Sequence, residues 1–488
     1  MKRSFAYDWF NSLEKLDEAQ LPPKVAFYSK LNSSNITDDD FEHAIEVWEH
    51  FKMTTTHEYH HLYMQVDVLL LTDVYENFRS VCLNIYGLDP CWYFTAPGLA
   101  WHACLRKTDV KLELLNDVDM LLMFEKGIRG GVSMIPKRYA KANNKYMKDF
   151  NLEEESKFIQ YLDANNLFGW AMSQSLPVSN FKWMTKVHLE NWREISSQED
   201  RGCILEVDLE YPKELQDLHN DHPLAPERIV VNKVEKLIPT LRKKDKYVLH
   251  HRKLKQYLEM GMNLTKIHRG ISFDEDAWLK PYIKLNAKLR TEASSEFEND
   301  FFKLMNNSVF GKTMENIRNR VDIRLRTDDK SADKLVSKPN YQGTTIFTED
   351  LVAVHMKKTE LVFSKPVYLG MSILDISKTL MYDFHYNYIK KKYGPKAKLL
   401  LTHTDSLMCE IHTEDFFEDI REDIKEKFDT SNFENPKLPR LNKKVPGIFK
   451  VETGGKTISD FVGLRAKSYA FDMDEDEFKK CKGVKNML

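Results

Sequence analysis

Apolar side chains recur at helical spacing in four stretches of the chain, and each stretch predicts a helix. Residues 37–52 begin with Thr37, a typical N-cap residue, and residues 57–86 carry apolar side chains along one face. Further helices are predicted near 98–106 and over 371–391. Helical structure is therefore expected in both halves of the chain.

Shorter apolar runs predict β-strands at 157–162, 203–209 and 264–273. Residues 398–402 and 406–411 flank a three-residue turn and predict a hairpin. Strands and helices follow one another without a βαβα rhythm. This order favours an α+β fold over a doubly wound α/β fold.

Two further stretches complete the pattern. Residues 277–315 predict two helices that are joined near Ser294 and Ser295. Residues 326–345 are polar and predict an insertion or an exposed loop.

Composition narrows the class of protein. The length of 488 residues predicts about three domains at roughly 150 residues each. Lys and Arg number 72 against 74 Asp and Glu, so the net charge of -2 argues against a histone-like coat or an acidic tail. Six cysteines without C-x-x-C spacing indicate a reducing compartment rather than a disulfide scaffold or zinc site.

Targeting signals are not evident in the sequence. No apolar run approaches the roughly 18 residues that span a bilayer. The first residues resemble no signal peptide, because no apolar segment follows the positive charges at Lys2 and Arg3. We expect an intracellular protein without a membrane partner, and the sequence leaves nucleus, cytoplasm and organelle open.

Two acidic residues stand where predicted strands end. Asp163 follows the strand at 157–162, and Asp405 lies in the turn of the predicted hairpin. Two carboxylates within about 4 Å repel by about 4 kcal/mol at an effective dielectric constant of about 20, so a site that joins them needs a divalent cation such as Mg²⁺. Taken alone, either aspartate is also consistent with an ordinary turn or cap residue.

One face of the second predicted helix within 277–315 combines different chemistries. Lys303, Asn307, Phe310 and Gly311 follow one another at i, i+4, i+7 and i+8. Such a face can hold phosphate with the lysine while a base pair stacks near the phenylalanine. Arg290 could reach the same phosphates from the preceding helix. The alternative is an amphipathic helix with a glycine stop and a solvated arginine.

In chain order, these segments resemble the motifs of family B DNA polymerases. The family motif D-x-x-S-L-Y-P corresponds to residues 163–169, and K-x-x-x-N-S-x-Y-G corresponds to residues 303–311. The motif Y-x-D-T-D-S corresponds to residues 401–406, and K-x-Y corresponds to residues 467–469.

Two upstream segments extend the resemblance. Residues 128–131 resemble the Y-x-G-G segment that links exonuclease and polymerase domains, and Tyr63 with Asp67 resembles the third exonuclease motif, Y-x-x-x-D. Within the family, the chain most resembles the protein-primed branch, which occurs in bacteriophages, linear plasmids and Polinton/Maverick-type mobile elements. The long intervals between the palm motifs leave room for the insertions that are characteristic of that branch.

The resemblance implies a right-hand polymerase core with an antiparallel-sheet palm, helical fingers and a partial exonuclease-like (RNase H-like) N-terminal domain. The catalytic residues would be Asp163 and Asp405. The ligands of two Mg²⁺ ions, for which Mn²⁺ can substitute, would be Asp163, Ala164 and Asp405.

The same resemblance implies residues for binding substrate and DNA. Those that would bind the incoming nucleotide are Phe168, Arg290, Lys303, Asn307 and Phe310. Those that would contact DNA are Gly130, Gly131, Gly311, Lys467 and Tyr469. Tyr63 and Asp67 would be the remnant of an exonuclease site without proofreading activity.

The chain departs from the family pattern at four positions. His403 replaces the first aspartate of D-T-D, and an imidazole there could weaken metal binding. Phe168 and Phe310 replace tyrosines and lose a hydroxyl but keep the ring. Ile128 replaces the tyrosine of Y-x-G-G.

The resemblance also divides the chain. The expected parts are the C-terminal remnant of a 3′–5′ exonuclease domain (1–95), a linker with the first palm segment (96–180), a palm extension or insertion (181–276), the fingers (277–320), an insertion (321–365), and a second palm segment with the thumb largely missing (366–488). We therefore expect a chain that is truncated at both ends relative to the family.

The function expected from the resemblance is template-directed addition of deoxynucleotides to a DNA 3′-end, in replication of a viral or mobile element. Its partners would be primer-template DNA, deoxynucleoside triphosphates and, if priming is by protein, a terminal protein. The alternative is a catalytically inactive DNA-binding remnant, disabled by His403 and the missing ends. A third interpretation, an RNA-dependent or RNA-making palm enzyme, is disfavoured by Phe168, which would close the space for a ribose.

Overall fold

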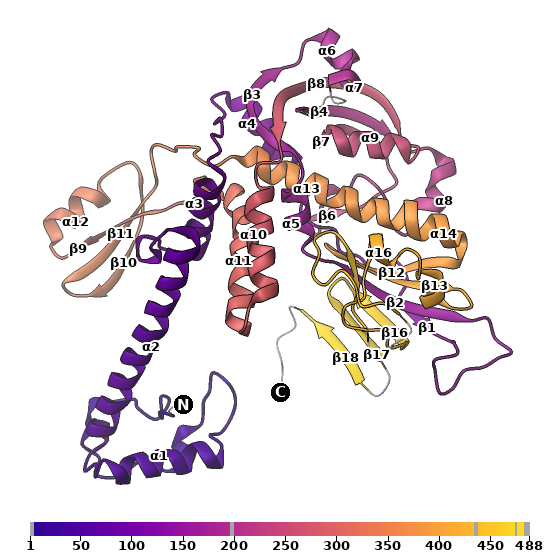
Figure 1. Ribbon diagram of the computed structural model, residues 1–488. Helices are drawn as coiled ribbons and strands as arrows, with labels where there is room; N and C mark the ends of the chain where they lie inside the picture. Colours follow the sequence, from indigo (N-terminus) through magenta and orange to yellow (C-terminus); the bar gives the residue numbers. More distant parts are fainter. Residues whose placement is uncertain (1–3, 196–199, 434–437, 474–475, 483–488) are drawn as a thin grey trace. The chain divides into compact units, whose positions relative to one another are not determined.

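The computed structural model describes residues 4–195, 200–433, 438–473 and 476–482 (Figure 1). The chain forms two compact units, Met1–Phe94 and Thr95–Leu488, which we call unit 1 and unit 2. No helix in the described residues is both long enough and apolar enough to span a bilayer.

Unit 1 is built from helices. Its elements are η1 (Leu13–Asp17), η2 (Lys24–Phe27), α1 (Asp38–His50), α2 (Thr56–Tyr86) and η3 (Pro90–Trp92). The predicted cap of α1 is confirmed, because the Thr37 side chain accepts a hydrogen bond from the Asp40 N–H. Among residues 4–94 the one extended pairing is an isolated bridge between Ser29 and Ser34. The link of this unit to an exonuclease domain therefore stays a prediction.

A five-stranded sheet forms the centre of unit 2. Its strands in spatial order are β12 (Ala397–His403), β13 (Ser406–His412), β2 (Lys157–Ala164), β15 (Phe449–Val451) and β14 (Phe428–Asp429). All neighbours are antiparallel except β14 and β15. The predicted strand at 157–162 and the predicted hairpin are both confirmed, and we call this the palm sheet.

The two faces of the palm sheet are covered by different elements. Alternate residues of β2, β12 and β13 pack on one face against Met381, Phe384 and Ile389 from the helix formed by α13 (Val367–Tyr382) and its π-helical continuation η6 (Asp383–Lys390). The other face packs against a second sheet. The strands of that sheet are β1 (Tyr139–Lys141), β16 (Ile458–Arg465), β17 (Ser468–Met473) and β18 (Asp476–Cys481).

A separate four-stranded sheet occupies most of the stretch between the first two polymerase-like motifs. Its strands in spatial order are β3 (Leu176–Trp183), β8 (Asn263–Asp276), β4 (Arg201–Glu210) and β7 (Lys244–His250). Helix α9 (His251–Glu259) packs on this layer, and its core also contains Tyr382, the last residue of α13, and Tyr386 of η6. The α13–η6 helix therefore packs on both sheets.

Smaller elements surround this layer. They are the hairpin β5 (Glu227–Val231) and β6 (Val234–Ile238), and the short helices α6 (Lys186–Glu190), α7 (Trp192–Ile195), η4 (Lys213–Leu215) and α8 (Gln216–His219).

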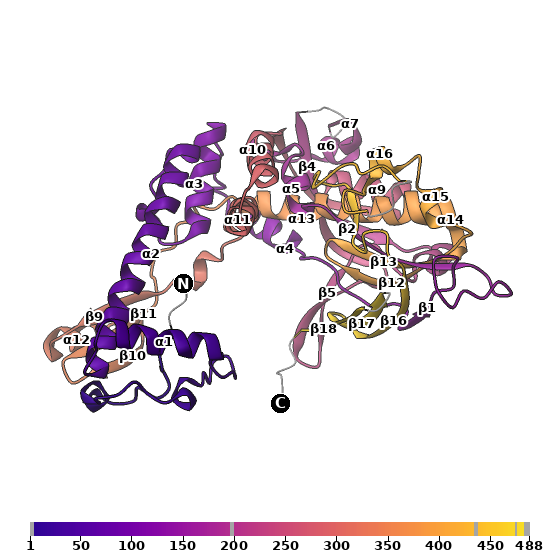
Figure 2. The ribbon, with the colours of Figure 1, turned by 60° about the horizontal axis from the view of Figure 1, so that its bottom comes forward.

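The predicted helix pair at 277–315 is present as α10 (Lys280–Glu292) and α11 (Glu296–Thr313), which lie side by side (Figure 2). The break falls where it was predicted, because Ser295 is the N-cap of α11 and accepts a hydrogen bond from the Glu298 N–H. Helix α3 (Ala96–Thr108) packs on α11, and α5 (Leu167–Met172) follows β2 directly.

The polar stretch at 326–345 was expected to be an insertion or an exposed loop, and the loop prediction is wrong. A three-stranded sheet forms there in the order β10 (Tyr341–Thr348), β11 (Leu351–Met356), β9 (Asp322–Arg326), with α12 (Asp329–Val336) on one face. Leu335, Val354 and Met356 make a small core. Few apolar residues are needed for so small a core, which is why the composition resembled that of a loop.

The remaining short elements of unit 2 complete the chain. They are α4 (Val118–Gly127), η5 (Ile317–Asn319), α14 (Lys391–Tyr393), η7 (Gly394–Lys396), α15 (Phe416–Asp419) and α16 (Ile424–Lys427). The mixture of antiparallel sheets and segregated helices confirms the predicted α+β class.

Candidate active site

The palm sheet brings together the two aspartates that the sequence singled out, although they lie 242 positions apart. Asp163 is on β2 and pairs across the sheet with Ser406, the first residue of β13. Asp405 is in the tight turn before β13, and its carbonyl accepts a hydrogen bond of 2.7 Å from the Ala164 N–H. Strand register and this backbone bond therefore fix both residues at the same end of the neighbouring strands β2 and β13.

The turn that carries Asp405 is held from its other side by the segment after Gly127. Met134 and Thr402 exchange two backbone hydrogen bonds of 3.0 Å, which add this segment to the edge of β12. Gly131 lies so close to the turn that a Cβ placed on it would be 2.1 Å from Thr404 Oγ1. By contrast, a Cβ on Gly130 would have no atom within 4 Å. Only the second glycine is thus required by close packing.

The electrostatics of the site follow from crowded carboxylates. Burial, and then the charges of Asp405 and Glu452, raise the pKa of Asp163 to about 8, against the opposing effect of Lys450 and Lys303. Burial also raises the pKa of Asp405. Carboxylates that resist ionisation together are the oxygen ligands that a divalent cation favours, so the donor set fits Mg²⁺.

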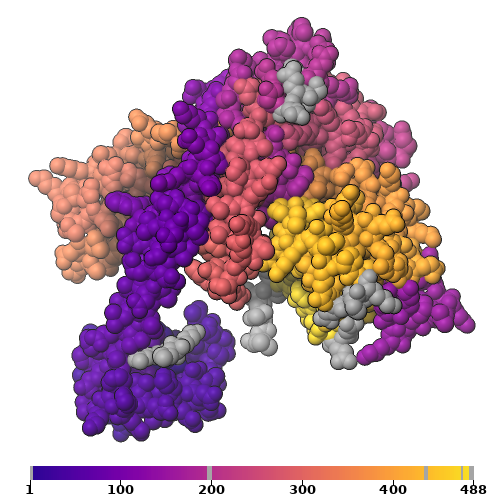
Figure 3. All heavy atoms as spheres, viewed as in Figure 1, coloured from indigo at the N-terminus to yellow at the C-terminus, as the bar shows by residue number. Residues whose placement is uncertain are grey.

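A cavity of about 530 Å³ opens beside these aspartates, between the palm sheet and helices α10 and α11. Figure 3 shows the surface hollowed between the α10–α11 pair and the C-terminal part of the chain drawn in yellow. The residues predicted from sequence that line it are Asp163, Ala164, Phe168, Arg290, Lys303, Asn307 and Asp405. Residues from three distant segments therefore face one space.

The two phenylalanines that replace tyrosines contact each other. The rings of Phe168 and Phe310 are stacked, with centroids 4.5 Å apart and an angle of 13° between their planes. Phe168 belongs to α5 and Phe310 to α11, so the stack joins the palm to the helix pair. The neighbouring Gly311 is open, because a Cβ there would have no atom within 4 Å.

A second cavity of about 470 Å³ also borders the aspartates and shares Asp163, Phe168 and Asp405 with the first. It is also lined by His403 and by three cations, Lys467, Lys480 and Lys482. Of the predicted pair Lys467 and Tyr469, only the lysine borders this space. The tyrosine ring is 4% exposed and packs in the core between the two sheets.

His403 stands where the family motif has an aspartate. Its Nδ1 lies 3.3 Å from Ser133 Oγ, and its ring is 5.5 Å from that of Tyr469 between centroids. Burial, followed by the charges of Lys480 and Lys467, lowers the pKa of His403 to about 4. The imidazole is therefore neutral near pH 7 and adds no positive charge beside the aspartates.

Five charged residues of the first cavity were missed by the sequence analysis: Asp429, Lys443, Lys444, Lys450 and Glu452. Lys450 faces Asp163 across the β2–β15 pairing, and its Nζ lies 3.1 Å from Glu452 Oε2. These residues come from a stretch with no apolar periodicity and no motif, so their position only emerges from the long-range pairing of β15 with β2.

Tyr63 and Asp67 lie one turn apart on α2 of unit 1. The Tyr63 hydroxyl is 2.5 Å from that of Tyr7. Burial, followed by hydrogen bonds to Tyr7 and Asp67, raises the pKa of Tyr63. The ring packs near Phe5, with centroids 5.2 Å apart. Their assignment to an exonuclease remnant stays a prediction.

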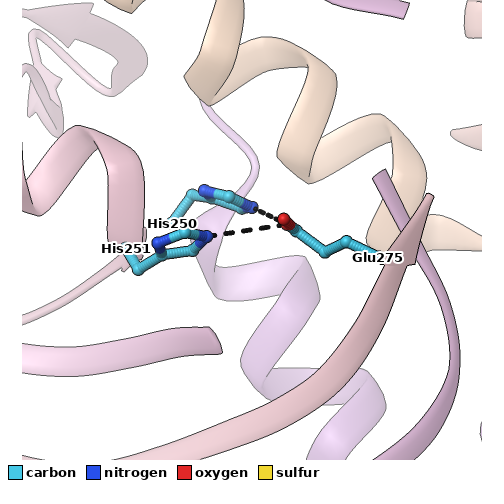
Figure 4. A group of neighbouring side chains, drawn as sticks. All are labelled: His250, His251 and Glu275. Carbon is cyan, nitrogen blue, oxygen red and sulfur yellow. Dashed lines mark hydrogen bonds and ion pairs between the residues drawn. The ribbon is translucent and has the colours of Figure 1, made fainter. Parts of the chain in front are cut away.

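One buried cluster in the described residues has the composition of a metal site: His250, His251 and Glu275 (Figure 4). His250 Nδ1 accepts from the Arg252 N–H, which leaves Nε2 protonated to donate to Glu275 Oε1 at 3.0 Å. The Arg252 guanidinium lies 2.8 Å from the other oxygen of Glu275. Hydrogen bonds and an ion pair thus satisfy this carboxylate, and the cluster joins β7 and α9 to β8.

Comparisons with known proteins show the family of the chain and its fold. The sequence profile of the family described as DNA polymerase type B, organellar and viral, matches residues 1–391. No curated protein matched the chain. In a ternary complex with primer-template DNA and incoming nucleotide substrates, Phi29 DNA polymerase is 15% identical over 80% of this chain, with a TM-score of 0.50.

Other solved structures are also similar. Phi29 DNA polymerase in a binary complex with primer-template DNA is 15% identical, covers 84% of this chain and 63% of its own, and has a TM-score of 0.49. A family B DNA polymerase from the archaeon Pyrobaculum calidifontis is 10% identical, covers 85% of this chain and 36% of its own, and has a TM-score of 0.27. The present chain spans 61% of the length of the Phi29 polymerase in the ternary complex.

Proposed function

Because this chain belongs to the organellar and viral type B DNA polymerases, we propose that it adds deoxynucleotides to the 3′-end of a DNA primer under the direction of a template. One observation carries the proposal. Asp163 and Asp405 lie together at the end of the β2–β13 pairing in the palm sheet, and Arg290 and Lys303 line the same cavity from α10 and α11.

The carboxylates supply the ligands for metal ions. In our proposal Asp163, Asp405 and the Ala164 carbonyl hold two Mg²⁺ ions, which Mn²⁺ can replace. Bound there, the ions would lower the pKa of the primer 3′-hydroxyl and neutralise the departing pyrophosphate. The raised pKa of Asp163 supports this role, since a cation relieves the repulsion from Asp405 and Glu452.

The remaining residues of the first cavity position the nucleotide. Arg290 and Lys303 bind its phosphates, and Asn307 packs against the sugar and base. Phe310 does not line the cavity itself, but it stacks on Phe168, which does, and we propose that it packs on the nucleotide beside that ring. Phe168 lies under the sugar and leaves no space for a 2′-hydroxyl, which makes the substrate a deoxynucleotide. The stacking of Phe168 on Phe310 keeps the two rings in place for these roles.

The second cavity is proposed to hold the primer strand. Lys467 contacts its phosphates, and Tyr469 supports the strand carrying that lysine from the core. Gly130, Gly131 and Gly311 are proposed to allow a close approach of DNA. Gly130 and Gly311 have the free space that this needs, whereas the space at Gly131 is taken by Thr404.

The predicted division of the chain is retained within this proposal. The palm comes from 96–180 and 366–488, the fingers from 277–320, and the insertions from 181–276 and 321–365, with 1–95 an exonuclease remnant. The partners are primer-template DNA and deoxynucleoside triphosphates. Priming from the hydroxyl of a terminal protein is proposed from the likeness to the protein-primed branch.

His403 favours a second candidate, a DNA-binding protein without polymerase activity. This residue offers a neutral imidazole where the family motif places a carboxylate. The two candidates differ in one measurable respect: both bind primer-template DNA, but only the polymerase extends the primer.

Primer extension with Mg²⁺ or Mn²⁺ tests the proposal. We expect extension by the parent chain, and a loss of at least about 10³-fold, or roughly 4 kcal/mol of barrier, for Asp405→Asn. The matched control is Asp245→Asn. This aspartate is exposed, pairs with Lys243 and lines neither cavity. Equal rates for Asp405→Asn and the parent would refute the site, and binding without extension by the parent would favour the second candidate.

A further inference from the structure

A short irregular segment of unit 2 carries two lysines into the first cavity. This segment, residues 438–447, lies between β14 and β15, and we call it the palm strap. Lys443 and Lys444 both line the cavity beside Asp163 and Asp405. Neither lysine belongs to a motif recognised in the sequence, so the strap is an additional source of positive charge at the site.

The palm strap is held in a fixed and strained conformation. Asn442 and Lys444 have φ angles of 62° and 59°, in the left-handed region that lysine rarely adopts. Asn442 Nδ2 donates to the carbonyls of Ile424 and Phe428, both at 2.9 Å. The Lys444 N–H donates to Asp429 Oδ2 at 3.0 Å. Such strain persists where the surroundings impose it, and it is concentrated at functional sites.

The Lys444 side chain shares an acceptor with Arg290. Lys444 Nζ donates to Asn299 Oδ1 at 3.3 Å, and Arg290 Nε donates to the same oxygen at 3.0 Å. One neutral amide oxygen thus holds two cations. Burial, followed by the charges of Arg290 and Lys443, lowers the pKa of Lys444. The arrangement therefore favours the binding of an anion, which would neutralise both Lys444 and Arg290.

Nearby carboxylates do not supply this neutralisation. Glu452 is paired with Lys450 at 3.1 Å, and the Asp429 oxygens accept from Asn165 and from backbone N–H groups of Ser431 and Lys444. Within the described part of the chain, no carboxylate forms an ion pair with Lys444 Nζ. The Lys444 ammonium group can therefore donate further hydrogen bonds, and its side chain lines the cavity.

We infer that Lys444, which the palm strap carries, binds a phosphate of the incoming nucleotide next to Arg290, in the cavity that Lys303 also lines. This inference rests on the proposed function. A phosphate of the primer strand has the same chemistry, but Lys444 lines only the first cavity, whereas the cations of the second are Lys467, Lys480 and Lys482. The nucleotide triphosphate would therefore contact a cation carried by the palm strap as well as those of α10 and α11.

Steady-state extension of a primer-template by dATP, opposite a templating thymine, tests the inference. For Lys444→Ala we expect KM for dATP to rise about tenfold, the effect of one charge-assisted hydrogen bond, while kcat and the Kd for primer-template stay close to those of the parent. Lys444→Arg should restore most of the affinity. Lys425→Ala is the matched control, because Lys425 is exposed on α16 and lines neither cavity.

Further measurements distinguish a loss of phosphate binding from a folding defect, and a phosphate of the nucleotide from a phosphate of the primer strand. If Lys444→Ala lowers the melting temperature, Lys444→Gln replaces it, since glutamine keeps a donor and most of the length. A rise in Kd for primer-template with an unchanged KM for dATP would assign the phosphate to DNA and overturn the inference. An unchanged KM and Kd would overturn it as well.

Equilibrium binding of dATP in the presence of Ca²⁺ distinguishes this inference from the proposed function. A parent chain that extends primers with a KM insensitive to Lys444→Ala overturns the inference alone. A parent chain that extends no primer, yet binds dATP about tenfold more tightly than Lys444→Ala, supports the inference while the proposed activity fails. A parent chain that neither binds dATP nor extends primers overturns both.

Discussion

Two adjacent glycines illustrate how much a single residue can matter at this site. We predict that Gly131→Ala destabilises unit 2 by about 1–3 kcal/mol, because the new methyl group would overlap the Thr404 side chain at 2.1 Å and displace the turn that carries Asp405. Thermal or urea unfolding measures the loss.

Gly130→Ala is the matched control for this prediction, since its added Cβ would meet no atom within 4 Å. This control variant should unfold with at least the stability of the parent, because alanine restricts the unfolded chain more than glycine does. The double variant Gly131→Ala/Thr404→Gly should recover part of the loss, because it removes the overlapping atoms. Equal stability of the two single variants would contradict the packing that we describe.

A buried ion pair joins two helices at the scale of elements. Lys253 on α9 and Asp375 on α13 are both fully buried, and Nζ lies 2.8 Å from Oδ1. We predict that Lys253→Met destabilises the protein by about 3 kcal/mol, because the Asp375 carboxylate would lose its partner in a dry environment. The charge of the nearby Lys378 also lowers the pKa of Asp375 and so limits the loss.

The double variant Lys253→Met/Asp375→Leu separates a pair from two independent residues. It should be less destabilised than the sum of the two single variants, because no buried charge is left without a partner. Lys288→Met is the control, since its ion pair with Glu292 is exposed and its loss should cost about 0–1 kcal/mol. Additive losses in urea unfolding would refute the coupling.

Elements that depend on local pattern could be predicted from the sequence. The break between α10 and α11 falls at Ser294 and Ser295, because a serine N-cap is a local signal. The β12–β13 hairpin was likewise predictable, since two apolar runs flank a short turn. The positions of Asp163 and Asp405 at the ends of these strands followed from the same reasoning.

Features that depend on long-range pairing could not be predicted in this way. Glu452 reaches the site only because β15 pairs with β2, and Lys444 does so only because side-chain hydrogen bonds fix an irregular strap. The fold of residues 322–356 was missed because its core is small and its surface polar. Local periodicity contains no information on such contacts between distant segments.

Burial of histidines couples protonation to the folding of the whole of unit 2. His219 and His222 lie in the core between the 211–224 segment and η6, where the Tyr386 hydroxyl donates to the His222 carbonyl at 2.6 Å. Burial, followed by the charge of His385, lowers the pKa of His219 to about 4 and that of His222 to about 3. Asp221 opposes both shifts and Lys390 reinforces them, so these neighbours set the net charge around the pair.

The direction of the resulting pH dependence follows from proton counting. A histidine in the unfolded chain takes up a proton below about pH 6.5, whereas these two stay neutral in the folded protein until about pH 4 or below. We therefore predict that the free energy of unfolding decreases as the pH falls from about 6.5 to 4, measured by urea unfolding across that window. His222→Phe keeps an aromatic ring against Tyr382 and should reduce the dependence of the unfolding free energy on pH. The control His188→Gln changes an exposed histidine and should not raise the stability at low pH relative to the parent. A slope in His222→Phe equal to that of the parent would show that this imidazole does not enter the folded core in its neutral form.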